Sequence, residues 1–346
     1  MTRIALLARL LAASALMGAC AGSAGISTTA SSDASDAFAP GKRVLLDAHN
    51  AYPERGRWDD RLSRALATGL PLAIEQDLHW YRDPSTGLRH SVVAHDDDAL
   101  AGAPTLESYF FDAIRPIMEQ ALAENRRETW PLVTLNLDFK SNEREHHDAV
   151  WATLSKYERW LTTAPRSATP HEPSPLSAGP LLVLTGSDAG QRQRFHDDVP
   201  VGQRLLLFGA EPVPSPIGVT RAARERAMVR LSPGRLIPSR ASNYARWVNF
   251  SWIAVEEGGA ARAAEWTPRD SSRLVSLVQR AHAQGYWIRF YTLDGFLAAE
   301  DAGYSPEYNF GGSESAGLRW RAALDAGVDF LATDQYERFA GLRGSR

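Results

Sequence analysis

Short apolar runs alternate with amphipathic stretches from Val44 to the C-terminus, and this alternation limits the possible folds more than any other feature. The run at 44–46 is followed by apolar residues at helical spacing from Trp58 to Gly69, and similar pairs recur along the chain. Strands that alternate with helices are typical of βα units around a parallel sheet. The strand candidates are about as many as a closed eight-stranded barrel needs. We therefore predict an α/β fold, a TIM-type (β/α)8 barrel in a single domain.

The individual elements are predicted from the same patterns. Three stretches interrupt the alternation of strands and helices, at 164–180, 211–240 and 301–315. The last of these carries three aromatic residues and is either the wall of a substrate cleft or a surface loop. The predicted strands are 44–46, 72–78, 91–94, 132–139, 181–185, 205–208, 247–253, 287–292 and 328–332, and the main predicted helices are 105–124, 143–161, 274–283 and 317–326.

The N-terminal region differs from the rest of the chain. Arg3 and Arg9 flank an Ala/Leu stretch that ends in small residues, which is typical of a secretory signal. The sequence from Met17 to Cys20 resembles the bacterial lipobox, in which the cysteine becomes the lipidated N-terminus, although a plain cleaved signal is the alternative. We predict a signal peptide at 1–19, a lipidated flexible tether at 20–40 and the barrel at 41–346. The protein is thus expected to be secreted across the inner membrane as a bacterial lipoprotein, anchored on the periplasmic or outer side.

Composition excludes other classes of protein. The chain is 44% apolar and 23% charged, as in soluble globular domains, and Cys20 is the only cysteine, so no intramolecular disulfide is possible. A formal net charge of -3, without a basic patch, argues against a nucleic-acid partner.

Residues with catalytic chemistry lie at or near the ends of four predicted strands. Glu75 and Asp77 are separated by one residue of a strand, so their side chains point to the same face. Catalytic groups of α/β barrels lie at the carboxyl ends of the strands. We therefore expect one mouth of the barrel to collect His49, Asn50, Glu75, Asp77, His95, Asp138 and Lys140.

These residue types favour phosphodiester cleavage. Glu75, Asp77 and Asp138, with the amide oxygen of Asn50, form an all-oxygen ligand set for one divalent cation, Ca²⁺ or Mg²⁺. Such an ion would bind a phosphate oxygen and lower the pKa of an attacking hydroxyl. His49 and His95 are predicted as the catalytic acid and base, and Lys140 as a phosphate-binding residue.

Neighbouring residues are given supporting roles or left with two interpretations. Asp96 is predicted to orient His95, and His79 lies two residues beyond Asp77 on the same face of the strand. Asp334 is either a helix N-cap or a site residue. Arg289 either contacts phosphate or forms an ion pair at the mouth of the barrel.

The motifs H-N, E-x-D, H-D and D-x-K, at His49, Glu75, His95 and Asp138, resemble the PLC-like phosphodiesterase superfamily, which includes phosphatidylinositol-specific phospholipase C and glycerophosphodiester phosphodiesterase. The resemblance runs from Val44 to the C-terminus and implies a TIM-type barrel, phosphoric diester hydrolase activity and a role in lipid metabolism. The H-N-x-Y opening, with Thr105-Leu106 followed by Tyr109, is most similar to an uncharacterised branch that includes a fungal mitochondrial-inheritance protein.

The motifs combine features of both groups of enzymes. Asn50 matches the phospholipases C, Asp96 matches the glycerophosphodiesterases, and Asp138 stands where Glu is usual. The resemblance implies a small phosphodiester or lipid head group as substrate, either a glycerophosphodiester or a phosphoinositide-like head group. The alternatives are a sphingomyelinase D-like activity that forms a cyclic phosphate, and a non-catalytic lipoprotein that binds a phosphorylated ligand.

Overall fold

A computed structural model describes residues 38–54, 57–214, 220–263, 265–300 and 303–344. The predicted signal peptide, the lipidation site Cys20 and most of the predicted tether lie outside these described residues. No helix within the described ranges is long and apolar enough to cross a membrane.

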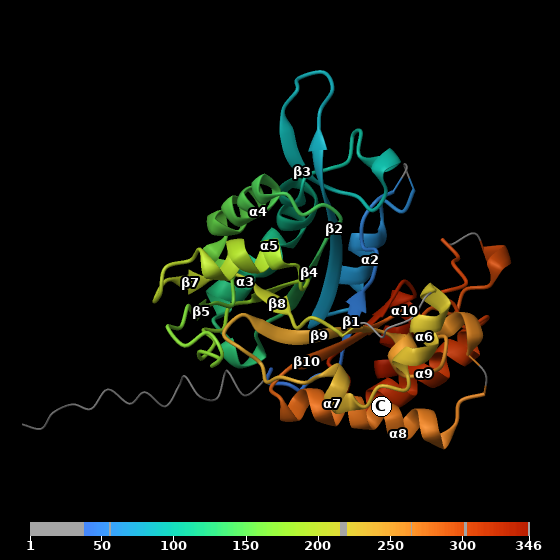
Figure 1. The fold of residues 1–346 in the computed structure, drawn as a ribbon. Coiled ribbons are helices and arrows are strands. Elements are labelled where there is room, and N and C mark those ends of the chain that lie inside the picture. Colours follow the sequence, from blue (N-terminus) through green and yellow to red (C-terminus); the bar gives the residue numbers. More distant parts are fainter. Residues whose placement is uncertain (1–37, 55–56, 215–219, 264, 301–302, 345–346) are drawn as a thin grey trace, which may run out of the picture.

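Eight parallel strands form a closed barrel with helices around it, which confirms the predicted fold class (Figure 1). The ring closes because β1 pairs with both its neighbours, the second strand and the last strand of the barrel. In order around the ring the strands are β1 (Leu45–Ala48), β2 (Leu72–Arg82), β4 (Val133–Phe139), β6 (Leu181–Thr185), β8 (Phe208–Ala210), β9 (Ala245–Ser251), β10 (Trp287–Tyr291) and β11 (Phe330–Thr333).

Of the nine predicted strands, one lies outside the barrel and one lies only partly in it. The run at 91–94 belongs to β3 (Arg89–Val93), which pairs antiparallel with β2 in a hairpin that extends beyond the barrel in Figure 1. In the run at 205–208, only Phe208 belongs to the barrel; β7 (Arg204–Leu205) instead pairs with β5 (Ala164–Pro165) in a separate two-stranded sheet. A short apolar run predicts extended backbone, but only the pairing partner decides whether it enters the ring.

The helices begin and end where local chemistry favours it. Thr267 and Asp270 form a capping box at the start of α8, and Gly327, with φ 76°, ends α9 in the left-handed conformation. The helices are α2 (Arg61–Ala67), α3 (Asp112–Glu124), α4 (Arg144–Lys156), α5 (Ala189–Arg192), α6 (Arg221–Met228), α7 (Pro233–Leu236), α8 (Pro268–Ala283), α9 (Ser313–Ala326) and α10 (Tyr336–Gly344).

The amino-terminal end of the barrel is closed by apolar side chains. Phe38 is buried and stacks on Trp287, the first residue of β10, with ring centroids 5.6 Å apart. The indole Nε1 of Trp287 donates a hydrogen bond of 2.8 Å to the carbonyl of Phe38. The folded part of the chain therefore includes Phe38, which lies inside the stretch predicted as tether. Access to the barrel is left at the opposite end, where the strands finish.

Candidate active site

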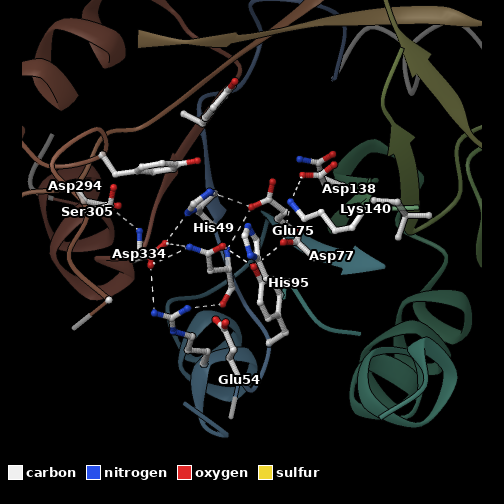
Figure 2. A pocket seen from close by; sticks show the side chains of 18 of the residues that line it. His49, Glu54, Glu75, Asp77, His95, Asp138, Lys140, Asp294, Ser305 and Asp334 are labelled. Carbon is white, nitrogen blue, oxygen red and sulfur yellow. Dashed lines mark hydrogen bonds and ion pairs between the residues drawn. The ribbon is translucent and has the colours of Figure 1, made fainter. Parts of the chain in front are cut away.

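A cleft of about 660 Å³ opens at the carboxyl ends of the strands (Figure 2). It is lined by residues of β2, β4, β9 and β10 and of the segments that follow β1, β3, β4, β6, β10 and β11. The structure brings eight of the predicted residues together in its lining: His49, Asn50, Glu75, Asp77, His95, Asp96, Asp138 and Lys140.

His49 directly follows β1 and is held between two carboxylates. Its Nδ1 lies 2.7 Å from Oδ1 of Asp334, and its Nε2 lies 3.4 Å from Oε2 of Glu75. Asp334 is 285 residues away in sequence but directly follows β11, the strand that pairs with β1. Burial by itself would lower the pKa of His49, but the charges of Glu75 and Asp334 outweigh it and raise the pKa to about 9. A pKa of this size favours the cationic form of the imidazole at neutral pH.

Asp334 is a site residue, which decides between the two interpretations of this position. Its carboxylate accepts hydrogen bonds of 3.2 Å from Nδ2 of Asn50 and from Nη2 of Arg61. Burial would raise the pKa of Asp334, but the charges of His49 and Arg61 hold it below the usual value. An ionised carboxylate at this position keeps a proton of His49 on Nδ1, and Nε2 is the ring nitrogen on the side of Glu75.

His95 lies at the rim of the cleft, with 47% of its side chain exposed. Its Nδ1 lies 2.6 Å from Oδ1 of Asp96, the residue predicted to orient it. Nε2 of His79 donates a hydrogen bond of 2.8 Å to the carbonyl of His95, and His79 is not part of the cleft lining. The two neighbours thus hold the ring and the backbone of His95 separately.

Three carboxylates converge beside the histidines. Glu75 and Asp77 point the same way from β2, as their spacing predicts, and Asp138 stands opposite Asp77 on β4. One oxygen of each carboxylate lies within 4.8 Å of one oxygen of each of the other two. Nζ of Lys140 contacts Asp138 at 2.7 Å and Asp77 at 3.1 Å. Arg289 donates from Nη2 to Oε1 of Glu75 at 3.0 Å.

Arg289 is buried and forms an ion pair, which decides between the two interpretations of this residue. It bonds Asp47 as well as Glu75, so one arginine serves two buried carboxylates. Its charge, together with those of His49 and Lys140, keeps the pKa of Glu75 below the usual value although burial alone would raise it.

The carboxylate cluster carries more negative charge than its neighbours neutralise. Burial and the charge of Glu75 raise the pKa of Asp77 to about 7, even though Lys140 opposes the shift. A buried carboxylate that resists ionisation in this way would gain from further positive charge. Because the donor atoms are all oxygens, the set fits a hard divalent cation such as Ca²⁺ or Mg²⁺.

Asn50 has contacts other than the predicted ones. Its Oδ1 accepts a hydrogen bond of 2.6 Å from the hydroxyl of Tyr52, which also lies 2.7 Å from Oδ2 of Asp77. Its Nδ2 is directed to Asp334. The amide therefore links the histidine network to the carboxylate cluster, and its role as a metal ligand stays a prediction.

Several cleft residues were not predicted. Oδ1 of Asp294 accepts hydrogen bonds from the backbone N–H of Asp334 at 2.8 Å and from Oγ1 of Thr333 at 2.6 Å. Burial and the charge of Asp334 raise the pKa of Asp294 to about 7. Asp294 lies three residues beyond β10, so the end-of-strand rule that found the other candidates indicates it too. No local signal marks Arg61, the first residue of α2.

The loop between β10 and α9 forms part of the cleft wall. Ser305 and Tyr308 line the cleft, and the ring of Tyr308 lies 5.5 Å from that of His49. Of the two interpretations of the stretch at 301–315, the structure supports the cleft wall.

No protein-family model matches the chain, and no curated protein sequence matches it either. Among solved structures, a glycerophosphoryl diester phosphodiesterase from Parabacteroides distasonis is 16% identical, with 88% of this chain and 87% of that chain covered and a TM-score of 0.39. A calcium-dependent phosphoinositol-specific phospholipase C from Pseudomonas is 12% identical, with 87% and 92% covered and a TM-score of 0.47.

A dihydropteroate synthase from Burkholderia cenocepacia also matches, at 15% identity, with 88% and 90% covered and a TM-score of 0.38. Enzymes of different chemistry therefore match this chain about equally well, and similarity at this level does not decide the function. The predicted branch with the mitochondrial-inheritance protein is not among these structures and stays a prediction.

Proposed function

We propose that this protein is a metal-dependent phosphodiester hydrolase that uses His49 and His95 as its acid and base. One observation carries the proposal: two imidazoles, each hydrogen-bonded through Nδ1 to a carboxylate, line the same cleft as three converging carboxylates. A protein that only binds a ligand has no need of two oriented imidazoles, whereas cleavage of a phosphodiester needs a proton to be taken from one oxygen and given to another.

The histidines divide the proton transfers between them. One takes the proton from the attacking hydroxyl, and the other gives a proton to the leaving oxygen. Asp334 and Asp96 fix the Nδ1 protons, so that Nε2 of each ring is the atom that exchanges a proton with substrate. Lys140, at the edge of the carboxylate cluster, offsets negative charge on the phosphate.

Glu75, Asp77 and Asp138 would hold one divalent cation, Ca²⁺ or Mg²⁺, and that ion would supply positive charge for a phosphate oxygen and lower the pKa of a bound hydroxyl. The substrate class we propose is a glycerophosphodiester or a phosphoinositide-like head group. The signal-like N-terminus with Cys20 supports a lipid-anchored protein that meets such molecules at a membrane surface.

The test is hydrolysis of bis-p-nitrophenyl phosphate and glycerophosphocholine by the purified protein, first with EDTA and then with Ca²⁺ or Mg²⁺ added back. We expect activity to disappear with EDTA and to return with the ion. Inactivity on every phosphodiester with each ion, together with unchanged ligand binding by His49→Ala, would contradict the catalytic reading and favour a binding protein. Phosphorus NMR of the products separates hydrolysis from the sphingomyelinase D-like reaction, which leaves a cyclic phosphate.

A further inference from the structure

Arg61 connects both halves of the candidate site through one guanidinium group. It is the first residue of α2 and is only 5% exposed. Its Nη2 donates to Oδ2 of Asp334 at 3.2 Å, and its Nη1 donates to the backbone carbonyl of Asn50 at 2.9 Å. Arg61 therefore contacts two neighbours of His49: the carboxylate of Asp334, which is hydrogen-bonded to the His49 ring, and Asn50, the next residue in the chain.

The bond to Asn50 constrains the backbone beside the carboxylate cluster. Asn50 has φ 51°, in the left-handed region that few non-glycine residues adopt. In this conformation its N–H points to Oε2 of Glu75 at 3.3 Å, while its carbonyl accepts from Arg61. A less common backbone conformation persists when surrounding contacts require it, and Arg61 provides one of these contacts.

Arg61 is itself held in place by an aromatic neighbour. Its Cζ lies 4.0 Å from the centroid of the Trp58 ring, within the range of a cation–π contact. Trp58 also has a left-handed backbone, with φ 60°. Gly303, in the loop after β10, packs so closely that a Cβ added there would lie 3.2 Å from the indole. The guanidinium thus lies beside two loops that pack against each other, one after β1 and one after β10.

We infer that Arg61 is the positioning residue of this site, which fixes Asp334 and the Asn50 backbone so that His49 and Glu75 keep their relative orientation. Two bonds in divergent directions need the planar fork of arginine, which the single ammonium of lysine does not reproduce. The kinetic test of this role rests on the proposed function, because it needs phosphodiester hydrolysis. The spectroscopic test does not, because it is made without substrate.

The spectroscopic test measures the ring of His49 without substrate. The nine histidines are labelled with ¹⁵N, and the His49 signals are assigned by their loss in His49→Gln. We expect Arg61→Gln to change the Nδ1 chemical shift of His49, because the hydrogen bond to Asp334 loses its alignment. Arg64→Gln is the matched control, since Arg64 lies one turn along α2 and also pairs with a carboxylate, Glu337, but is outside the cleft lining. It should leave the shift unchanged.

The kinetic test separates positioning from substrate binding. We expect Arg61→Gln to lower kcat by about 100-fold, with KM changed much less, because a small misplacement of a catalytic group costs about that factor. Arg61→Lys keeps the charge and should recover part of the loss. If near-ultraviolet circular dichroism shows that Arg61→Gln is unfolded, Arg61→Lys takes its place in both tests.

The outcomes are distinguishable. An unchanged Nδ1 shift in the folded Arg61 variant overturns the inference whatever the activity, and so does a raised KM with unchanged kcat. If the wild-type protein cleaves no phosphodiester but the Nδ1 shift responds to Arg61→Gln, the proposed function fails and the positioning role stands.

Discussion

Two buried histidines, one in the cleft and one in the outer wall of the barrel, are held in opposite ways. His49 lies among the carboxylates of Asp334 and Glu75, whose charges overcome burial and raise its pKa to about 9. His146, on α4, has no exposed surface, and burial lowers its pKa to about 4. Its Nδ1 lies 3.0 Å from the carbonyl of Ser141, and its Nε2 lies 2.8 Å from the hydroxyl of Ser91, so its neutral form is fully hydrogen-bonded.

The difference separates the parts of the molecule that serve chemistry from those that serve folding. In the outer wall, the ring of His146 is buried in its neutral form with both nitrogens hydrogen-bonded, and such burial costs little free energy. The cleft instead keeps ions in a buried setting, with Arg289 shared by Asp47 and Glu75 and with Asp77 only partly neutralised by Lys140. Unequal charge of this kind is costly, and we interpret it as the mark of a site that receives a cation and a phosphate.

The largest expected effect is the loss of activity when His49 in the cleft is replaced. His49→Gln should lower kcat/KM for a phosphodiester by about 1,000-fold, within the range of general acid–base catalysis. His146→Gln removes a histidine that is equally buried but does not line the cleft, and should leave kcat/KM within about threefold of wild type. Comparable losses in steady-state assays of the two variants would mean that His49 has no chemical role.

The second prediction concerns the shared arginine. Arg289→Gln leaves Asp47 and Glu75 buried without their common cation, and should lower the free energy of unfolding by about 3–5 kcal/mol at pH 7. Arg64→Gln breaks an exposed pair with Glu337 and should cost less than about 1 kcal/mol. Urea unfolding followed by circular dichroism measures both. Equal costs would show that the charges of the cleft are screened like surface charges.

The smallest expected effect is the pH dependence of stability that His146, in the outer wall, contributes. The pKa of His146 is about 4 in the folded protein and about 6.5 in the unfolded chain, so between these values the unfolded state binds the extra proton. The stability that His146 contributes is therefore fully present above pH 6.5 and is lost as the pH falls, by about 3 kcal/mol at pH 4. Glu143, His147 and His79 are the charged or titratable groups that affect it most.

The measurement is urea unfolding of wild type and His146→Gln at intervals from pH 7 to pH 4. The difference between the two curves isolates His146 from the carboxylates that titrate in the same range. We expect wild type to lose stability more steeply than the variant, and parallel curves would contradict a neutral, buried His146.

Much of the fold was predictable because it depends on local patterns. The period of the apolar residues identified all eight barrel strands to within a few residues, and the spacing of Glu75 and Asp77 placed both carboxylates on one face of β2. The patterns do not indicate which strand pairs with which. The run that forms β3 was therefore grouped with the barrel strands, although β3 forms a hairpin with β2.

The sequence by itself determined the alternating elements, the barrel class and the site residues that lie on β2 and β4 or follow β1, β3 and β4, because each depends on neighbours a few positions away. Only the tertiary structure decided that Asp334 holds His49, that Arg289 pairs with Glu75 and that Arg61 reaches Asp334, across separations of 285, 214 and 273 residues. The physical reason is ring closure: pairing of β1 with β11 brings the first and last strands of the barrel together, and this pairing depends on every strand between them.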